Sequence, residues 1–272
     1  MTDLAPAITG SLRRISALVL RHVYVLRTSW PRLLELAYWP VMQVIVWGFI
    51  STFLRTNSSW VAQAAGVLIA AALLWDVLFR AQLGVSVSFL EEMWSRNLGH
   101  LFVSPLRPWE MVLGMMCMSF IRTMIGMVPA ALIAIPFYHY SIFSMGLPLL
   151  AFFLNLMIMG WSVGIAVAGL ILRYGMAAES FAWVSIFAFA PVSGIYYPIT
   201  TLPEWLRPAA WALPSAHVFE GMRTVMFEQR FPLGHFFAAV GLNLVFLALA
   251  GLAFVLAFRY ARRRGKLLAM GE

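Results

Sequence analysis

The sequence has little charge, and this shortage excludes several classes of protein. Charged residues make up 11% of its 272 residues and hydrophobic residues 62%. A typical soluble domain carries about 25% charged residues. A water-soluble globule of this size cannot hide that much apolar surface, and a disordered chain would carry far more charge. We therefore expect an integral membrane protein built from helices, which satisfy their own backbone hydrogen bonds in lipid.

Cysteine and catalytic motifs are also scarce. The single cysteine, Cys117, lies in an apolar run, which excludes a disulfide framework and a thiolate metal cluster. The chain holds no His-Glu-x-x-His and no Gly-x-Ser-x-Gly, and its histidines are scattered. Its one Gly-Lys pair, Gly265-Lys266, lacks the upstream glycine of a phosphate-binding loop. We expect no enzyme activity, no metal site and no cofactor, so that any ATP hydrolysis occurs on another chain.

The basic excess has a simple explanation in a membrane protein. The net charge is +8, from 19 basic and 11 acidic side chains. In a soluble protein this balance would indicate a nucleic-acid partner. Here it indicates arginines that flank membrane spans on the cytoplasmic side, so we expect no nucleic acid.

Six stretches are apolar over about the 20 residues that a helix needs to cross a bilayer. The fifth in chain order begins at Phe181 and is broken by Pro191, Gly194 and Pro198, whereas no such cluster of breaking residues interrupts the other five. We therefore predict an all-α polytopic membrane protein with six transmembrane helices in one domain, residues 33–258. The other five spans are expected at residues 33–54, 61–90, 111–137, 146–172 and 235–258.

Residues 8–30 have the pattern of an amphipathic helix. Apolar residues recur at steps of three or four along one face. The other face carries Arg13, Arg14, Arg21 and Arg27. The pattern predicts that residues 1–32 form a cytoplasmic interfacial helix in the headgroup plane, with its arginines toward anionic lipid. Packing of the same helix against the transmembrane bundle is the alternative interpretation.

Both termini are predicted to be cytoplasmic. In that orientation 13 of the 19 basic residues lie in cytoplasmic segments, including the basic tail 259–272, whereas four lie outside and two within spans. This excess is what the positive-inside rule requires. An even number of spans also returns the chain to the side on which it started.

Prolines interrupt the fifth apolar stretch and the segment after it. Pro191 and Pro198 fall within or directly after the stretch, and three further prolines follow before residue 215. A proline removes a helical backbone donor, and bare backbone cannot face lipid. The segment must therefore be buried in protein or line a water-filled cavity, and we predict re-entrant half-helices over residues 190–234. The residues singled out in this outer segment are Ser193, Gly194, Tyr196, Tyr197 and Pro198.

The polar segment 91–110, between the second and third spans, mixes charges with large apolar residues. The apolar residues are Leu98, Leu101, Phe102 and Leu106. Their helical spacing predicts a short amphipathic helix at the cytoplasmic surface, stopped by Pro105. Such residues need a surface that buries them, and a cytoplasmic partner is one candidate. A solvated loop that happens to carry apolar residues is the other interpretation.

Two motifs resemble those of a known family. The first begins with Glu91-Glu92, continues with Arg96-Asn97-Leu98 and ends with Leu101-Phe102-Val103-Ser104-Pro105-Leu106. The second is Pro191-Val192-Ser193-Gly194-Ile195-Tyr196-Tyr197-Pro198, followed by segments 202–207 and 214–223. Both are similar to the corresponding segments of type-2 ABC exporter permeases. The number and spacing of the spans agree with that family along essentially the whole chain.

This resemblance implies a function and a set of partners. In that family the loop equivalent to residues 91–106 docks in a cleft of a cytoplasmic ATPase subunit, and two permease chains assemble with two ATPase subunits. ATP and Mg²⁺ are then needed only on the partner, and Glu91 and Glu92 mark the cytoplasmic gate region. The implied ATPase-coupling residues are Glu91, Glu92, Arg96, Asn97, Leu98, Leu101, Phe102, Ser104, Pro105 and Leu106.

Three charged residues lie within the predicted spans. Asp76 and Arg80 are four residues apart and share one helix face, whereas Arg122 lies in the third span. A charge at bilayer depth costs a few kcal/mol or more, so it usually faces the bundle interior or water. One interpretation is that these residues line the pathway and contact a polar or anionic headgroup. The other is that Asp76 pairs with Arg80 or Arg122 and holds spans together.

Taken with the resemblance, the sequence predicts the permease subunit of an ATP-driven exporter in a bacterial inner membrane, assembled as a homodimer. Amphipathic lipids, lipid-linked sugars and hydrophobic drugs are all compatible cargoes. A proton-coupled secondary carrier and a structural membrane subunit of a larger complex are the alternatives. Co-purification of an ATPase is the observation that discriminates among them.

Overall fold

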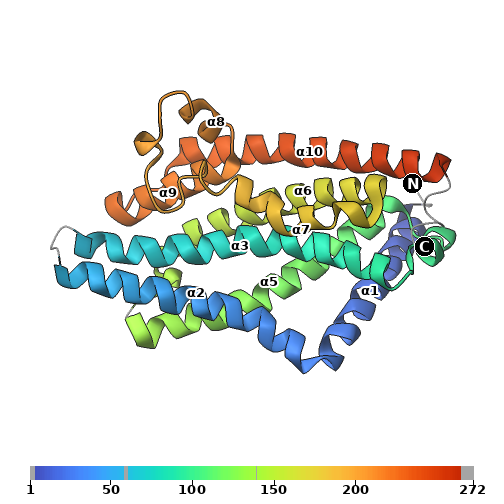
Figure 1. Cartoon of the computed structure of the whole chain (residues 1–272), viewed down its shortest axis with the longest axis horizontal. Coiled ribbons are helices and arrows are strands. Elements are labelled where there is room, and N and C mark those ends of the chain that lie inside the picture. The colour runs from blue at the N-terminus through green and yellow to red at the C-terminus, as the bar shows by residue number, and fades with distance from the viewer. Residues whose placement is uncertain (1–3, 58–60, 139, 265–272) are drawn as a thin grey trace.

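The computed structural model describes residues 4–57, 61–138 and 140–264, which form helices and short connections without a β-strand. The long helices run along one axis (Figure 1). α1 (Leu4–Thr28) and α4 (Leu98–Val103) lie at one end of this bundle, which we call the α4 end. α8 (Arg207–Trp211) and α9 (Pro214–Glu228) lie at the other, which we call the α8 end.

Five of the described helices are long and apolar enough to cross a membrane. They are α2 (Trp30–Asn57), α3 (Val61–Trp94), α5 (Pro108–Tyr138), α6 (Leu147–Tyr174) and α10 (Leu233–Arg263). Each coincides with one of the spans that the sequence predicts outside the proline-broken stretch, so these five predictions are confirmed as helices of spanning length.

The proline-broken stretch that begins at Phe181 is not among these five helices. It is divided between α7 (Ser180–Val184), a 3-10 helix (Ser185–Ala188) and turns that continue to Tyr197. The segment packs against α3 and α6 and runs back from the α4 end to the α8 end (Figure 1). The predicted interruption is therefore present, whereas a sixth spanning helix and re-entrant half-helices stay predictions. Further 3-10 helices cover Ile142–Met145, Gly175–Ala178 and Ile199–Thr201.

α3 forms the centre of the bundle. Of its most apolar window 78% is buried within the chain, compared with 17% for α2 and 22% for α10. α2, α5 and α6 all pack against α3. The outer helices thus present most of their apolar surface outward, where lipid can cover it, and α3 is enclosed by protein.

Two glycines bring α6 against α3. A Cβ atom at Gly160 would lie 2.7 Å from the carbonyl oxygen of Leu78, and one at Gly164 would lie 2.8 Å from that of Gln82. Because no side chain occupies such distances, the helices approach this closely only where both positions lack one. The spacing of four residues puts both glycines on one face, as in other small-residue contacts between membrane helices.

Replacing Gly160 with leucine should therefore separate α6 from α3. We expect a loss of roughly 1–3 kcal/mol in the free energy of unfolding, the usual cost of overpacking. Thermal unfolding of the detergent-purified protein measures the effect. Gly251→Leu is the matched control, because nothing lies within 4 Å of a Cβ atom at Gly251 of α10. Equal melting temperatures for the two variants would contradict the close contact.

An arginine of α9 holds the turn that follows the broken segment. Nη2 of Arg223 donates to three backbone carbonyl oxygens, those of Gly194, Ile195 and Tyr197. Glu220, one turn earlier on α9, accepts a hydrogen bond of 2.6 Å from the backbone nitrogen of Ile199. The backbone groups of this turn thus have partners although no regular helix supplies them.

Two histidines join α9 to α10 at the same end. Nδ1 of His217 lies 3.1 Å from Nδ1 of His235, and Nε2 of His217 lies 2.9 Å from the carbonyl oxygen of Trp211. Because a carbonyl only accepts, Nε2 of His217 donates, and its Nδ1 accepts from His235 when the ring is neutral. Burial lowers the pKa of His217; the bond to Trp211 opposes this change, and the neighbouring His235 adds to it.

The stability of the protein should therefore fall as the pH falls. Below the ordinary histidine pKa of about 6.5, the unfolded chain binds a proton at His217 that the folded chain disfavours. The stability that the neutral ring contributes is thus present at higher pH and lost on acidification. We expect the melting temperature to fall when the pH is lowered from about 7.5 to about 5.5. This fall should be smaller in His217→Gln than in the unsubstituted protein. His100→Gln, at an exposed histidine of α4, is the control; the same pH dependence in both variants would contradict the interpretation.

Candidate functional site

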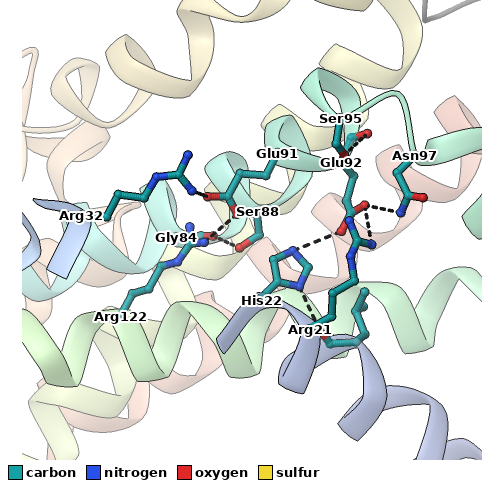
Figure 2. Close-up of polar contacts among 11 residues, drawn as sticks. Arg21, His22, Arg32, Gly84, Ser88, Glu91, Glu92, Ser95, Asn97 and Arg122 are labelled. Carbon is teal, nitrogen blue, oxygen red and sulfur yellow. Dashed lines mark hydrogen bonds and ion pairs between the residues drawn. The ribbon is translucent and has the colours of Figure 1, made fainter. Parts of the chain in front are cut away.

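Glu92, near the end of α3, is 1% exposed and connects α3 with α1. It accepts hydrogen bonds from Nη1 of Arg21 at 2.9 Å and Nδ2 of Asn97 at 2.8 Å, and its other oxygen lies 3.2 Å from Nε2 of His22 (Figure 2). Nδ1 of His22 lies 2.9 Å from the carbonyl oxygen of Leu18 and must donate to it. The guanidinium group of Arg21 thus supplies the positive charge that this buried carboxylate requires, and the amide of Asn97 adds a neutral donor.

Glu91 points to another side of α3 and connects α2 with α5. Oε2 of Glu91 accepts a hydrogen bond of 2.7 Å from Nη2 of Arg122, and Oε1 lies 3.6 Å from Nη1 of Arg32. Figure 2 shows the two arginines converging on this carboxylate from different helices. Arg122 is buried and Arg32 is exposed. One carboxylate is therefore shared by a buried and a hydrated guanidinium group.

A third carboxylate, Glu110, lies in the first turn of α5 and is fully buried. Arg14 of α1 binds it through two hydrogen bonds, from Nε at 2.8 Å and from Nη2 at 2.6 Å. Glu110 also accepts a hydrogen bond of 2.9 Å from the backbone nitrogen of Arg107, at a helix N-terminus where negative charge is favourable. Sequence reasoning missed this pair; an acidic residue in the first turn of α5 was its one visible signal.

α1 is packed against the bundle, as the alternative interpretation of residues 8–30 proposed. Leu18 and Leu26 are each 6% exposed, so this side of α1 is covered by the chain, whereas Leu12 and Trp30 of the predicted apolar stripe stay 60% and 69% exposed. Arg14 and Arg21, which the sequence directed toward lipid headgroups, instead bind buried glutamates of α5 and α3. The expectation is corrected for these two arginines, because their glutamates are distant in sequence and a helical pattern within α1 cannot reveal them. An interfacial position of the helix as a whole stays a prediction.

The chain turns sharply between α3 and α4. The backbone nitrogen of Arg96 donates to the carbonyl oxygen of Met93, and that of Asn97 donates to the carbonyl oxygen of Glu92, each at 2.9 Å. This is the Schellman pattern of a helix end, with Arg96 in the left-handed region at φ 54°. The predicted short helix follows at once as α4, beginning at Leu98.

The implied coupling residues differ in exposure. Leu98 is 3% exposed, so its side chain is covered by this chain and does not form an outer docking surface in this conformation. Val103, at the end of α4, is 84% exposed. The side chain of Phe102 lies outside the described part of the structure. Two implied residues are exposed, Arg96 and Pro105. Five are partly exposed, Glu91, Asn97, Leu101, Ser104 and Leu106.

The three charges within the spans do not form one cluster. Nε of Arg80 donates to Asp76 at 2.5 Å along the same helix, which is one of the two predicted pairings. Arg122 binds Glu91 instead of Asp76. Arg80, Arg122 and Glu91 all line a cavity of about 230 Å³. The lining of this cavity comes mainly from α2 and α3, with one residue each from α1, α5 and α7.

The outer residues predicted from the sequence lie together at the α8 end. Oγ of Ser193 lies 2.7 Å from Oγ of Ser215 of α9, and Gly194 adopts φ 62°, where a side chain would be strained. The ring of Tyr196 stacks on Trp47 of α2 at a centroid distance of 4.1 Å. The hydroxyl of Tyr197 donates to the carbonyl oxygen of Pro191, and Pro198 is exposed.

Residues 24–227, about three quarters of the chain, match the family model described as ABC-2 type transporter. The chain belongs to the ABC-2 type transporter family. The matched residues include Glu91, Glu92 and Glu110, all of α4, and the turn held by Arg223. This ABC-2 protein is therefore a multi-pass membrane permease component, a kind of domain that works with ATPase subunits. No curated protein matches the chain.

Neutralising Glu92 should detach α1 from the rest of this ABC-2 domain. In Glu92→Gln the groups of Arg21 and His22 lose their carboxylate, and we expect roughly 1–3 kcal/mol less stability at this contact. Limited proteolysis with trypsin reports it, because cleavage after the arginines of α1 should become faster. Glu228→Gln, at an exposed glutamate at the end of α9, serves as the control. Equal cleavage rates in the two variants would show that Glu92 does not hold α1.

Proposed function

We propose that this ABC-2 permease is the transmembrane subunit of an exporter that is driven by ATP hydrolysis on a separate subunit. One observation carries the proposal: Glu91 and Glu92 at the end of α3 tie α1, α2 and α5 to the helix that leads directly into α4. A movement of α4 would therefore reach α3 and, through these ion pairs, three further helices. The task of the chain is to convert that movement into a movement of its spans.

The proposed assembly contains two identical permease chains and two ATPase subunits in a bacterial inner membrane. Membership of the ABC-2 family supports an ATPase partner. The sequence has no phosphate-binding loop of its own, which supports hydrolysis on the partner. ATP and Mg²⁺ accordingly bind to the ATPase subunits, and the permease contributes the contact surface around α4.

The proposed topology has six crossings, both termini in the cytoplasm, and a re-entrant outer segment over residues 190–234. The course of the chain supports it: the segment that starts at α7 returns to the α8 end, and α1 and the end of α10 lie at the α4 end (Figure 1). The bias of basic residues supports a cytoplasmic α4 end. The cargo is an amphipathic or lipid-linked molecule or a hydrophobic drug, taken from the cytoplasm or the inner leaflet.

The contact surface can be tested at Val103, the exposed apolar residue at the end of α4. In Val103→Asp a charge replaces an apolar contact, and we expect at least a tenfold drop in the ATPase that co-purifies with the tagged chain. Trp205→Asp is the matched control, because Trp205 is also apolar and is 78% exposed, at the α8 end. Arg96→Gly removes a charge while preserving the left-handed backbone, so it reports on that side chain alone.

Equal ATPase recovery from Val103→Asp and Trp205→Asp would contradict docking at α4. Absence of any co-purifying ATPase would favour a structural subunit. Transport by the chain alone in liposomes, driven by a proton gradient without nucleotide, would replace the proposal with a secondary carrier.

A further inference from the structure

The cavity at the α4 end has a buried arginine with unused hydrogen-bonding capacity. Arg122 is 8% exposed and lines the cavity, and Nη2 is engaged by Glu91. Its Nε is buried and has no hydrogen-bond partner among the described residues. Leaving a buried donor of a charged group unpaired is costly. Because Arg122 lines the cavity, an acceptor there would add a partner to a guanidinium group that is incompletely hydrogen-bonded.

The charges around the cavity leave arginine donors available. The acidic lining residues are Glu91, which is shared by Arg32 and Arg122, and Glu35, which is exposed. Arg80 also lines the cavity and gives only Nε to Asp76. The interior of the cavity therefore presents guanidinium groups, the preferred partners of phosphate and carboxylate oxygens.

The remaining wall of the cavity is apolar and opens toward the outside of the bundle. Trp39 and Trp183 line it and are 59% and 45% exposed, so the opening lies on the surface that lipid can cover. Glu91 lies three residues before the end of α3, within about 5 Å of that end along the helix axis. This is the level at which lipid headgroups meet the ends of spanning helices.

The size of the cavity limits what can enter. A volume of about 230 Å³ corresponds to about eight water molecules at roughly 30 Å³ each. That is room for a phosphate-bearing headgroup and the first carbons of its tail. The rest of the tail would have to lie outside, along the exposed aromatic side chains.

We propose that this cavity binds the phosphate or carboxylate headgroup of an amphiphile, with Arg122 and Arg32 holding the acidic group and Trp39 and Trp183 contacting the start of the tail. That the bound molecule is cargo rests on the proposed function; the binding itself does not. The charge complementarity and the unpartnered Nε of Arg122 select an anionic headgroup over an uncharged one.

Binding can be measured by calorimetry on the purified full chain in a neutral maltoside detergent, with a single-chain alkyl phosphate and with inorganic phosphate as probes. We expect saturable binding of the alkyl phosphate and at least tenfold weaker binding of inorganic phosphate, which lacks a tail. Arg122→Gln should weaken alkyl phosphate binding at least tenfold, and Arg32→Gln should weaken it less, because Arg32 is exposed. Arg259→Gln, at an exposed arginine of α10, should bind as the unsubstituted chain does.

Because Arg122 also holds Glu91, a second variant keeps the test valid if Arg122→Gln fails to fold. Val87→Phe fills part of the cavity from α3, leaves every ion pair in place and should also weaken binding at least tenfold. Unchanged binding in Val87→Phe would overturn the inference, and so would inorganic phosphate binding as tightly as the alkyl phosphate. No ATPase is needed for this measurement. Lost alkyl phosphate binding with normal ATPase recovery would therefore count against this inference alone, and the reverse result against the proposed function alone.

Discussion

The structure depends on the pairing of charge in a region of low dielectric constant. Glu92 and Glu110 are buried and Glu91 is partly buried. Such carboxylates need cationic partners, because the desolvation of an unpaired carboxylate outweighs most other local interactions. Those partners come from α1, α2 and α5. Adjacent residues on a helix point about 100° apart, so Glu91 and Glu92 reach different neighbours. The angle of α1 and the positions of α2 and α5 beside α3 follow from this requirement.

The middle of the bundle is held differently. There the closeness of α3 and α6 depends on Gly160 and Gly164, which allow the two backbones to approach within contact distance. Lipid tails are as apolar as leucine, so the hydrophobic effect does not drive two helices together within lipid. The packing depends instead on dispersion contacts, which the missing side chains of the two glycines make possible. A central helix that is enclosed in this way keeps its ends in register with its neighbours, which allows Glu91 and Glu92 at one end of α3 to reach their partners.

Much of the fold could be predicted from the sequence because its signals are local. Long apolar stretches predict spanning helices, Pro191 and Pro198 predict an interrupted segment, and a short helix was expected after Arg96. The partners of Arg14 and Arg21 could not be predicted, because the glutamates they bind lie 96 and 71 residues away. The burial of Leu98 was missed for the same reason: exposure on an amphipathic helix depends on what packs beside it, and the sequence of α4 alone does not contain that information.

The turn bound by Arg223 has a consequence for how the molecule can change shape. At the α8 end, Arg223 and Glu220 bind main-chain atoms of one turn through four hydrogen bonds, and these would all have to break before the turn could move away from α9. At the α4 end Glu91 pairs with both Arg32 and Arg122. Either arginine can separate from Glu91 while the other still pairs with it. The α8 end is thus rigid, whereas the ion pairs of Glu91 at the α4 end can rearrange. A change of shape should therefore begin at the α4 end, and added salt should weaken the ion pairs of Glu91 there first.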